Sequence, residues 1–99
     1  MDCYTRAIDL NPKADFYFQR GFIYHSENKL DLAEADYNAS LKLDSNYGST
    51  LTNLGLIQSK RGSNIEAIDS YTRAIQANPQ DPISYNNRGY IFYKLLRYK

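Results

Sequence analysis

A 34-residue internal repeat restricts the fold of this 99-residue chain more than any other feature of its sequence. Gly21, Gly55 and Gly89 follow one another at intervals of 34 residues. Other residue types return at the same interval, and these are Tyr17, Leu51 and Tyr85; Ile23, Ile57 and Ile91; Ala33 and Ala67; and Tyr37 and Tyr71. A fixed period of this size predicts a stacked array in which each unit buries its apolar face against the next.

Each repeat is predicted to contain two helices. The chain has no Val and no Trp, and a composition rich in Leu, Ala, Lys, Arg and Gln favours helix. In the second unit apolar residues recur at helical spacing on both sides of Gly62 and stop at Asn78-Pro79. Gly62 is suited to a left-handed helix end, and Ser63 with Glu66 predicts a capping box. We therefore expect an all-α fold with helices at 2–10, 14–27, 30–43, 48–61, 64–77 and 82–97.

A further partial unit is visible at the N-terminus, because residues 4–12 match residues 71–79 at seven of nine positions. The period, with Tyr or Leu, then Gly, Tyr or Phe, Ala, Tyr, Ala and Pro in order, resembles the tetratricopeptide repeat. The resemblance implies a right-handed α-solenoid of antiparallel helix pairs, folded as a single domain over 1–99. Within it we expect the second helix of a partial repeat at 1–13, complete repeats at 14–47 and 48–81, and the first helix of a partial repeat at 82–99.

The resemblance also implies a concave groove, lined by the first helix of each unit, that binds a peptide or a helix of a partner protein. Carried over position by position, the predicted groove residues are Gln19, Asn53, Asn87, Phe18, Phe22, Leu56, Tyr90, Tyr93, His25, Lys60 and Lys94. The same resemblance includes a clamp for the C-terminal carboxylate of certain chaperones. That clamp needs Lys and Asn where this chain has Phe18 and Phe22, so we expect no such partner.

Gln19, Asn53 and Asn87 each lie two residues before a repeat glycine and would stack as a ladder along the groove. A carboxamide both donates and accepts hydrogen bonds, so a row of them can bind the main chain of an extended peptide. The alternative is that these amides bind water or cap neighbouring helices.

The other groove residues also leave two interpretations open. The aromatic and leucine side chains would contact a partner, or some of them would point into the core between helices. His25, Lys60 and Lys94 would form a cationic rim that favours acidic residues in the ligand.

Arg20 and Asp36 are predicted to form a structural ion pair across the two helices of the first unit. The second unit has Leu54 and Ser70 at the equivalent positions, so both members change together. A functional anion site is the alternative interpretation, but local pairs of this kind are the more common case.

Composition excludes several classes of protein. The 12 basic and 11 acidic residues are well mixed and leave a net charge of +1, which argues against a nucleic-acid partner. A single Cys and a single His exclude an internal disulfide and a Cys-based zinc site, and neither residue has an evident catalytic partner. No run approaches the ~18 apolar residues of a membrane span, and no secretory signal is visible. We expect a cytoplasmic protein that is not an enzyme and has no cofactor, metal or membrane partner.

The predicted helices at the two ends are halves of one unit. Each end would leave an apolar face uncovered, and the halves of different copies could complete one another as a dimer or a filament. The alternative is that the sequence is a fragment of a longer array. Two functions follow: a scaffold that binds a partner segment in the groove, or a self-association module built from the terminal helices.

Overall fold

Helix is the only regular secondary structure in the described part of the chain. A computed structural model of the protein describes residues 6, 8, 10, 13–80 and 82–97. Its elements are α2 (Ala14–Ser26), α3 (Leu30–Leu43), α4 (Gly48–Lys60), α5 (Asn64–Ala77) and α6 (Pro82–Arg97). Each of these five helices agrees with its predicted range within one residue at either end. The helix expected at 2–10 and the residue Cys3 lie largely or wholly outside the described residues, although residues 6, 8 and 10 are helical.

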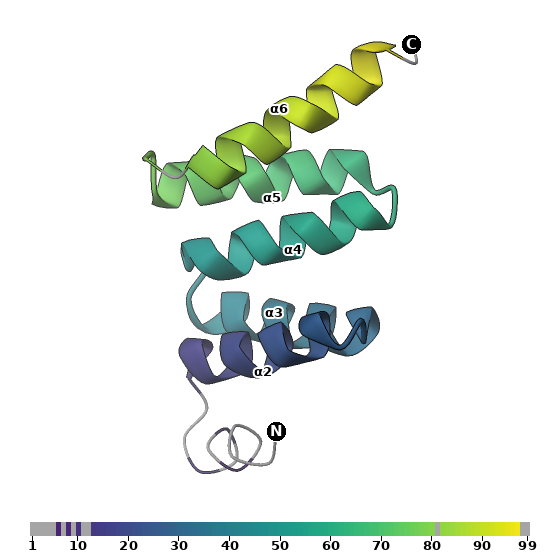
Figure 1. The fold of residues 1–99 in the computed structure, drawn as a ribbon. Coiled ribbons are helices and arrows are strands. Elements are labelled where there is room, and N and C mark those ends of the chain that lie inside the picture. Colours follow the sequence, from purple (N-terminus) through teal and green to yellow (C-terminus); the bar gives the residue numbers. More distant parts are fainter. Residues whose placement is uncertain (1–5, 7, 9, 11–12, 81, 98–99) are drawn as a thin grey trace.

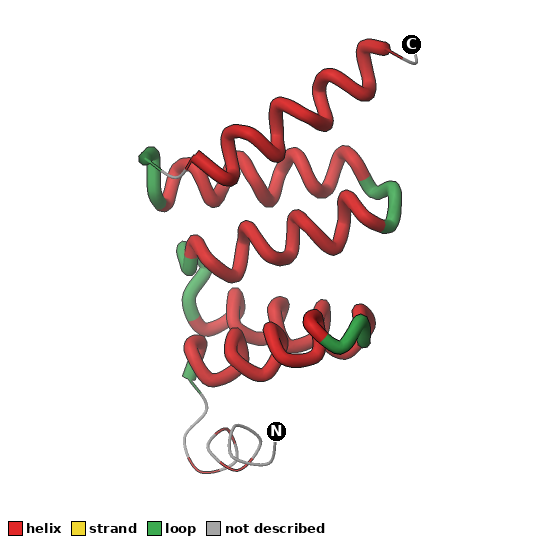
Figure 2. The backbone as a smooth tube through the Cα atoms, viewed as in Figure 1, coloured by secondary structure: helices red, strands yellow, loops and turns green. Residues whose placement is uncertain are grey.

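The helices stack in sequence order into an elongated body of 48 × 26 × 18 Å (Figure 1). Helix α2 packs against α3, α4 packs against α5, and α6 packs against α5. The tube in Figure 2 shows the short turns that join each helix to the next and reverse the chain direction. The predicted all-α solenoid is therefore confirmed.

A buried tyrosine explains the glycine inside the first helix of each complete pair. A Cβ atom at Gly21 would lie 2.8 Å from Cε1 of Tyr37, and one at Gly55 would lie 2.6 Å from Cε1 of Tyr71. Real Cβ atoms do not approach a ring so closely, because packed interiors leave no room for overlap. Tyr71 is almost fully buried, and this burial raises the pKa of its hydroxyl to about 12. The tyrosine ring atoms are thus the nearest neighbours of both glycines.

The turn between α4 and α5 supports one prediction and corrects another. Gly62 has φ +81°, as expected for a left-handed helix end. Ser63, in contrast, makes no side-chain capping hydrogen bond, so the predicted capping box is wrong. Its backbone has ψ 68°, whereas a serine whose hydroxyl reaches the first turn of a helix is normally extended.

Candidate functional site

Two hollows lie along the face formed by α2, α4 and α6, which we call the groove face. Figure 1 shows α2 in front of α3 and α6 in front of α5, so these first helices share one side of the stack. A hollow of about 300 Å³ is lined by Phe18, Gly48, Ser49, Thr52, Asn53, Asn78 and Ile83. A second hollow, of about 390 Å³, is lined by His25, Leu56, Ser59, Lys60, Tyr71, Asn87 and Tyr90. Seven of the predicted groove residues thus line these hollows, namely Phe18, His25, Asn53, Leu56, Lys60, Asn87 and Tyr90.

The three predicted ladder amides do not share one environment. The Gln19 amide donates to Asp15 Oδ1 at 3.5 Å, and Asn53 Nδ2 donates to the Ser49 carbonyl at 2.8 Å. Both bonds run back to the preceding turn of the same helix. Asn53 and Asn87 line the two hollows, whereas Gln19 lines neither. The structure therefore brings two amides to the groove face in positions where a ligand can reach them.

The apolar groove residues divide into one core residue and four exposed ones. Phe18 is half-buried, and its ring centroid lies 5.4 Å from that of Tyr47. It also packs against the core around Tyr37, so it holds the first repeat to the turn that follows α3. The exposed residues are Phe22 (49%), Leu56 (38%), Tyr90 (60%) and Tyr93 (56%). Exposed aromatic and leucine side chains of this kind are common at protein interfaces.

The predicted cationic rim is smaller than expected. Burial and the positive charge of Lys60 lower the pKa of His25, whose Nδ1 lies 3.2 Å from the hydroxyl of Tyr37. The lowered pKa disfavours the charged form of His25, so this residue adds less positive charge to the predicted rim than Lys60 and Lys94 do. Lys60 donates to Asn28 Oδ1 at 3.1 Å, and Lys94 Nζ lies 5.1 Å from the ring centroid of Tyr90. The groove face keeps two positive charges, one on α4 and one on α6.

Arg20 and Asp36 form a bidentate ion pair between α2 and α3. Nε lies 2.8 Å from Oδ2 and Nη2 lies 2.7 Å from Oδ1. Asp36 is 5% exposed, and its hydrogen bonds raise the pKa of Arg20. The guanidinium faces this buried carboxylate, which is the arrangement of a structural pair.

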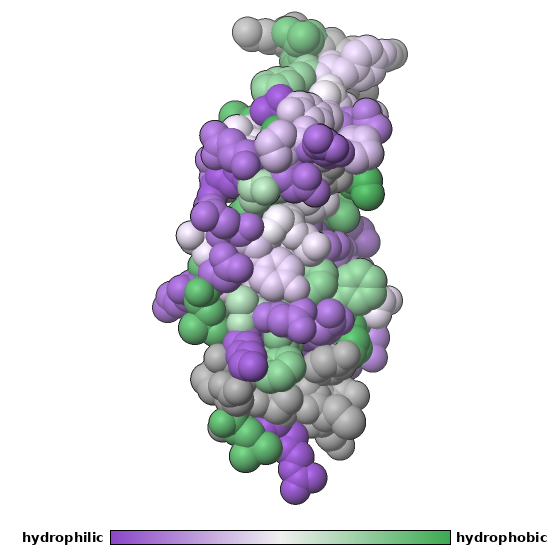
Figure 3. Space-filling view, turned by 90° about the vertical axis from the view of Figure 1, so that its left-hand side faces the viewer, coloured by the Kyte–Doolittle hydropathy of each residue, from purple (hydrophilic) through white to green (hydrophobic). Residues whose placement is uncertain are grey.

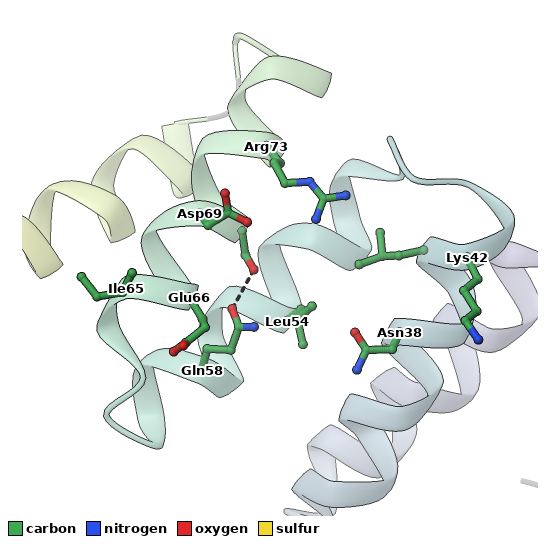
Figure 4. Close-up of a pocket in the computed structure, with 10 residues that line it drawn as sticks. Asn38, Lys42, Leu54, Gln58, Ile65, Glu66, Asp69 and Arg73 are labelled. Carbon is green, nitrogen blue, oxygen red and sulfur yellow. Dashed lines mark hydrogen bonds between the residues drawn. The ribbon is translucent and has the colours of Figure 1, made fainter.

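A larger hollow than these two lies on the other side of the stack, where the sequence predicted no site. It measures about 750 Å³ and lies between α3, α4 and α5 (Figure 4). Leu54 is part of its floor, and Ser70 donates to Gln58 Oε1 at 2.6 Å. Figure 4 shows Asn38 and Lys42 on one side of it and Asp69 and Arg73 on the other. In the second repeat, Leu54 and Ser70 stand at the positions where the first repeat has Arg20 and Asp36. This difference between the repeats was the sequence signal that a larger space could open here.

The described residues contain neither a cluster of metal-ligating side chains nor a membrane-spanning helix. No three His, Cys, Asp or Glu side chains gather there as a candidate metal site. Within the same residues, no helix is both long enough and apolar enough to span a membrane.

Seen from the side where α4 and α6 begin, hydrophobic residues form several small groups among hydrophilic ones (Figure 3).

Antiparallel helix pairs at a 34-residue period, hollowed along their first helices, define a helical-repeat solenoid. A family model described as tetratricopeptide repeat matches residues 14–47, and one described as TPR repeat matches residues 59–95. The chain belongs to the tetratricopeptide-repeat family.

The curated relatives are longer than this chain. The photosystem I assembly protein Ycf3 of Prochlorococcus marinus is 36% identical over 87 residues, which cover 83% of this chain and 49% of the relative. The protein of the same name from a Synechococcus species is 30% identical over 103 residues, which cover 94% of this chain and 57% of the relative. The chain therefore spans about half the length of the curated relatives it matches.

Two solved structures share the fold closely. The first TPR of Spaghetti (RPAP3), bound to an HSP90 peptide, superposes with a TM-score of 0.90 at 25% identity and covers 96% of this chain and 76% of that one. YrrB, described as a TPR protein with an unusual peptide-binding site, superposes with a TM-score of 0.87 at 27% identity. That match covers 93% of this chain and 48% of YrrB.

Proposed function

We propose that this chain is a protein-interaction scaffold whose groove face binds a segment of another protein. The observation that carries the proposal is the pair of hollows along α2, α4 and α6, bordered by exposed Leu56 and Tyr90. Concave sites that combine apolar side chains with a few polar groups are typical of ligand recognition. The peptides or peptide sites described for Spaghetti and YrrB support the same use of this fold.

In the proposed complex the amides of Asn53 and Asn87 bind the main chain of the partner segment, and Gln19 extends the ladder. An amide has two donors and one acceptor, so the bond from Asn53 to Ser49 occupies only one donor. Phe22, Leu56, Tyr90 and Tyr93 supply apolar contact on either side of the ladder. Lys60 and Lys94 favour a segment that carries acidic residues.

The partner proposed for the whole protein is a subunit of a larger assembly. The Ycf3 relatives are photosystem I assembly proteins, and a scaffold that holds one segment of a subunit fits such a role. A chaperone C-terminus is not the proposed ligand, although Spaghetti is described as bound to an HSP90 peptide. Phe18 and Phe22 occupy the positions where the resemblance places the Lys and Asn of that clamp, and neither can bind a carboxylate.

Removal of two ladder amides tests the proposed binding mode. Peptides that bind the chain would first be selected from a displayed library, and their Kd values measured by calorimetry. Asn53→Ala combined with Asn87→Ala should weaken binding by more than ~1 kcal/mol, or about fivefold in Kd, because each lost amide leaves a peptide group unpaired. Circular dichroism should show unchanged helicity.

The matched control is Gln76→Ala, which removes an exposed amide from α5 that lines neither groove hollow. It should leave the Kd unchanged. Equal affinity of the double variant and the wild type would rule out the ladder.

Self-association is the second candidate function. The observation that favours it is the exposed apolar surface of α6, where Tyr85 is 43% exposed and Leu96 is 73% exposed. Light scattering over a range of concentrations separates the two functions. A mass that grows with concentration supports self-association, and a constant monomer mass supports the scaffold.

A further inference from the structure

The hollow between α3, α4 and α5 is a cleft that the proposed groove does not use. Among the described helices, α3 packs on α2 and α4, and α5 packs on α4 and α6, so α3 and α5 meet only across α4. Helix α3 forms one wall, α5 forms the other and α4 forms the floor (Figure 4). All three helices belong to the two complete repeats. We call this space of about 750 Å³ the second-helix cleft, and it is defined by Asn38, Lys42, Leu54, Gln58, Asp69 and Arg73.

Small side chains keep the bottom of the cleft open. Three positions there hold smaller residues than the first repeat has one period earlier, and the pairs are Arg20 and Leu54, Tyr24 and Gln58, and Asp36 and Ser70. Ser70 donates to Gln58 Oε1 at 2.6 Å, and among the described residues nothing accepts a hydrogen bond from Gln58 Nε2. The bottom of the cleft therefore offers a ligand the apolar surface of Leu54 and one amide donor.

Four charged side chains line the cleft, and their signs are separated along it. They are exposed, and they are Lys42, Glu66, Asp69 and Arg73. Within the described part of the chain none of the four forms an ion pair. Arg73 Nη2 donates to the Ser45 carbonyl at 3.4 Å, and Figure 4 shows the side chain of Arg73 extending toward the α3 side. The two cations therefore lie toward the end of α3, and the two carboxylates lie nearer the start of α5.

Apolar side chains accompany these charges on all three helices. Leu54 is buried on the floor, Leu41 is half-buried on the α3 wall, and Ile65 is 73% exposed at the start of the α5 wall. A large apolar side chain that borders a hollow is a surface that a partner covers favourably. The complement of the cleft therefore has an apolar centre, an acidic end toward the two cations and a basic end toward the two carboxylates.

A helix fits the cleft better than an extended segment does. The walls and the floor are helices, whose main-chain groups bond within each helix, so an extended segment would find only side chains for its own main chain. A helix satisfies its main chain internally and packs its side chains into the groove between other helices. From Ile65 to Arg73 the α5 wall spans about 12 Å, because a helix rises about 1.5 Å per residue, and two helical turns have nearly that length.

We propose that the second-helix cleft binds an amphipathic helix of a partner protein, in which an acidic residue, two apolar residues and a basic residue stand at positions i, i+3, i+4 and i+7. These four positions lie on one face of a helix. The acidic residue faces Lys42 and Arg73, and the basic residue faces Glu66 and Asp69. The partner helix therefore runs antiparallel to α3 and α5, which places its acidic residue near its own N-terminus and opposes the helix dipoles.

A second copy of this chain does not supply such a helix. None of the 11 acidic residues in the sequence is followed by apolar residues at both the third and the fourth positions and by a basic residue at the seventh. Asp81 comes nearest, with Tyr85 and Arg88 in register, but its third position is Ser84. The occupant is therefore a different protein, and its site is separate from the proposed groove along α2, α4 and α6.

A designed helix tests the proposal with the whole chain. The probe is a stapled peptide that carries Glu, Leu, Leu and Lys at i, i+3, i+4 and i+7, with the staple on its opposite face, because a free helix of this length is marginal in water. Fluorescence anisotropy measures its Kd, and NMR shifts of the labelled chain locate it. We expect saturable binding, with the largest shifts at Leu54, Gln58 and Ile65. A stapled peptide with Glu and Lys exchanged should bind at least tenfold more weakly.

Two changes to the chain distinguish loss of the cleft from loss of the fold. Gln58→Tyr introduces the residue type found at Tyr24, one repeat earlier, and places a ring in the cleft. It should leave the Tm unchanged or higher and weaken binding of the probe at least tenfold. Lys42→Glu with Arg73→Glu changes only exposed side chains and should abolish binding. A probe with Lys in place of Glu should then restore it.

Matched controls account for net charge and for the groove. Lys13→Glu with Lys29→Glu makes the same change of charge outside the cleft and should leave the Kd unchanged. Asn53→Ala should also leave it unchanged, so failure of the groove proposal and failure of this one can be told apart. Absence of saturable binding, or equal affinity for the two peptides, would overturn the proposal. A wild-type dimer that Gln58→Tyr converts to a monomer would also overturn it, since a second copy would then occupy the cleft.

Discussion

At the scale of single residues, the two complete repeats join their helices by different means. The first repeat uses the bidentate pair of Arg20 and Asp36, whereas the second has Leu54 and Ser70 at these positions and Ser70 donates a hydrogen bond to Gln58 on α4. The pair in the first repeat has side chains that are 20% and 7% exposed, so loss of one member leaves a buried charge without its partner. The energetic importance of the pair lies in this penalty more than in its attraction.

A double-variant experiment tests this account. Arg20→Leu alone should destabilise the chain by ~3 kcal/mol, because the Asp36 carboxylate stays buried and unpaired. Arg20→Leu with Asp36→Ser copies the residues of the second repeat and should be more stable than the single variant. Urea unfolding of the wild type, both single variants and the double variant measures the coupling. Additive losses would show that the two side chains do not act as a pair.

At the scale of helices, the end of α2 is tied to the neighbouring helices through His25. Its ring contacts the hydroxyl of Tyr37 on α3, and the charge of Lys60 on α4 acts on it. Burial is the larger cause of its lowered pKa, and Lys60 adds to it. A proton on His25 therefore opposes the packing of three helices at once.

The pH dependence of stability follows from this contact. The folded chain binds the His25 proton more weakly than the unfolded chain, whose imidazole titrates near ~6.5. The stabilisation is therefore fully present above that pH and decreases as the pH falls through it. We expect the urea midpoint of the wild type to fall between pH 7 and pH 5 by more than that of His25→Gln. His25→Gln keeps every carboxylate, so its pH profile shows how much of the fall in the urea midpoint comes from carboxylates. Parallel pH profiles of the wild type and the variant would contradict the assignment of this pH dependence to His25.

At the scale of the whole molecule, the stack is a one-dimensional array with a well-packed middle. Helix α4 contacts helices on both sides and buries Thr50, Leu51, Thr52, Leu54, Gly55 and Ile57. In α6 only Ser84 and Ile91 are buried among its described side chains. Stability in such an array depends on contacts between neighbours, so it should differ along the stack.

Amide hydrogen exchange should reveal this gradient. We expect the slowest exchange in α4 and α5 and faster exchange in the second half of α6, which contacts other described helices on one side only. Exchange followed by NMR at pH 7 would measure protection residue by residue. Equal protection of α4 and α6 would mean that the array opens as a single unit.

The sequence by itself determined the helices, their period and the positions that form the groove face. Helix ends depend on local signals such as Gly62 and Asn78-Pro79, and the 34-residue repeat places equivalent residues on equivalent faces. For this reason the resemblance to the tetratricopeptide repeat could be carried over position by position, and it assigned Asn53, Leu56, Asn87 and Tyr90 to the groove.

Only the tertiary structure decided how neighbouring side chains change one another. The charge state of His25 depends on burial and on Lys60, which lies 35 residues away in the sequence. No rule based on the spacing of residues in a helix predicts an interaction over that separation. The failed capping box depends on a backbone angle at Ser63, and the hollow beside Leu54 depends on how α3, α4 and α5 surround it. Local pattern specifies which segments are helical, whereas burial, charge and empty space arise from contacts between helices.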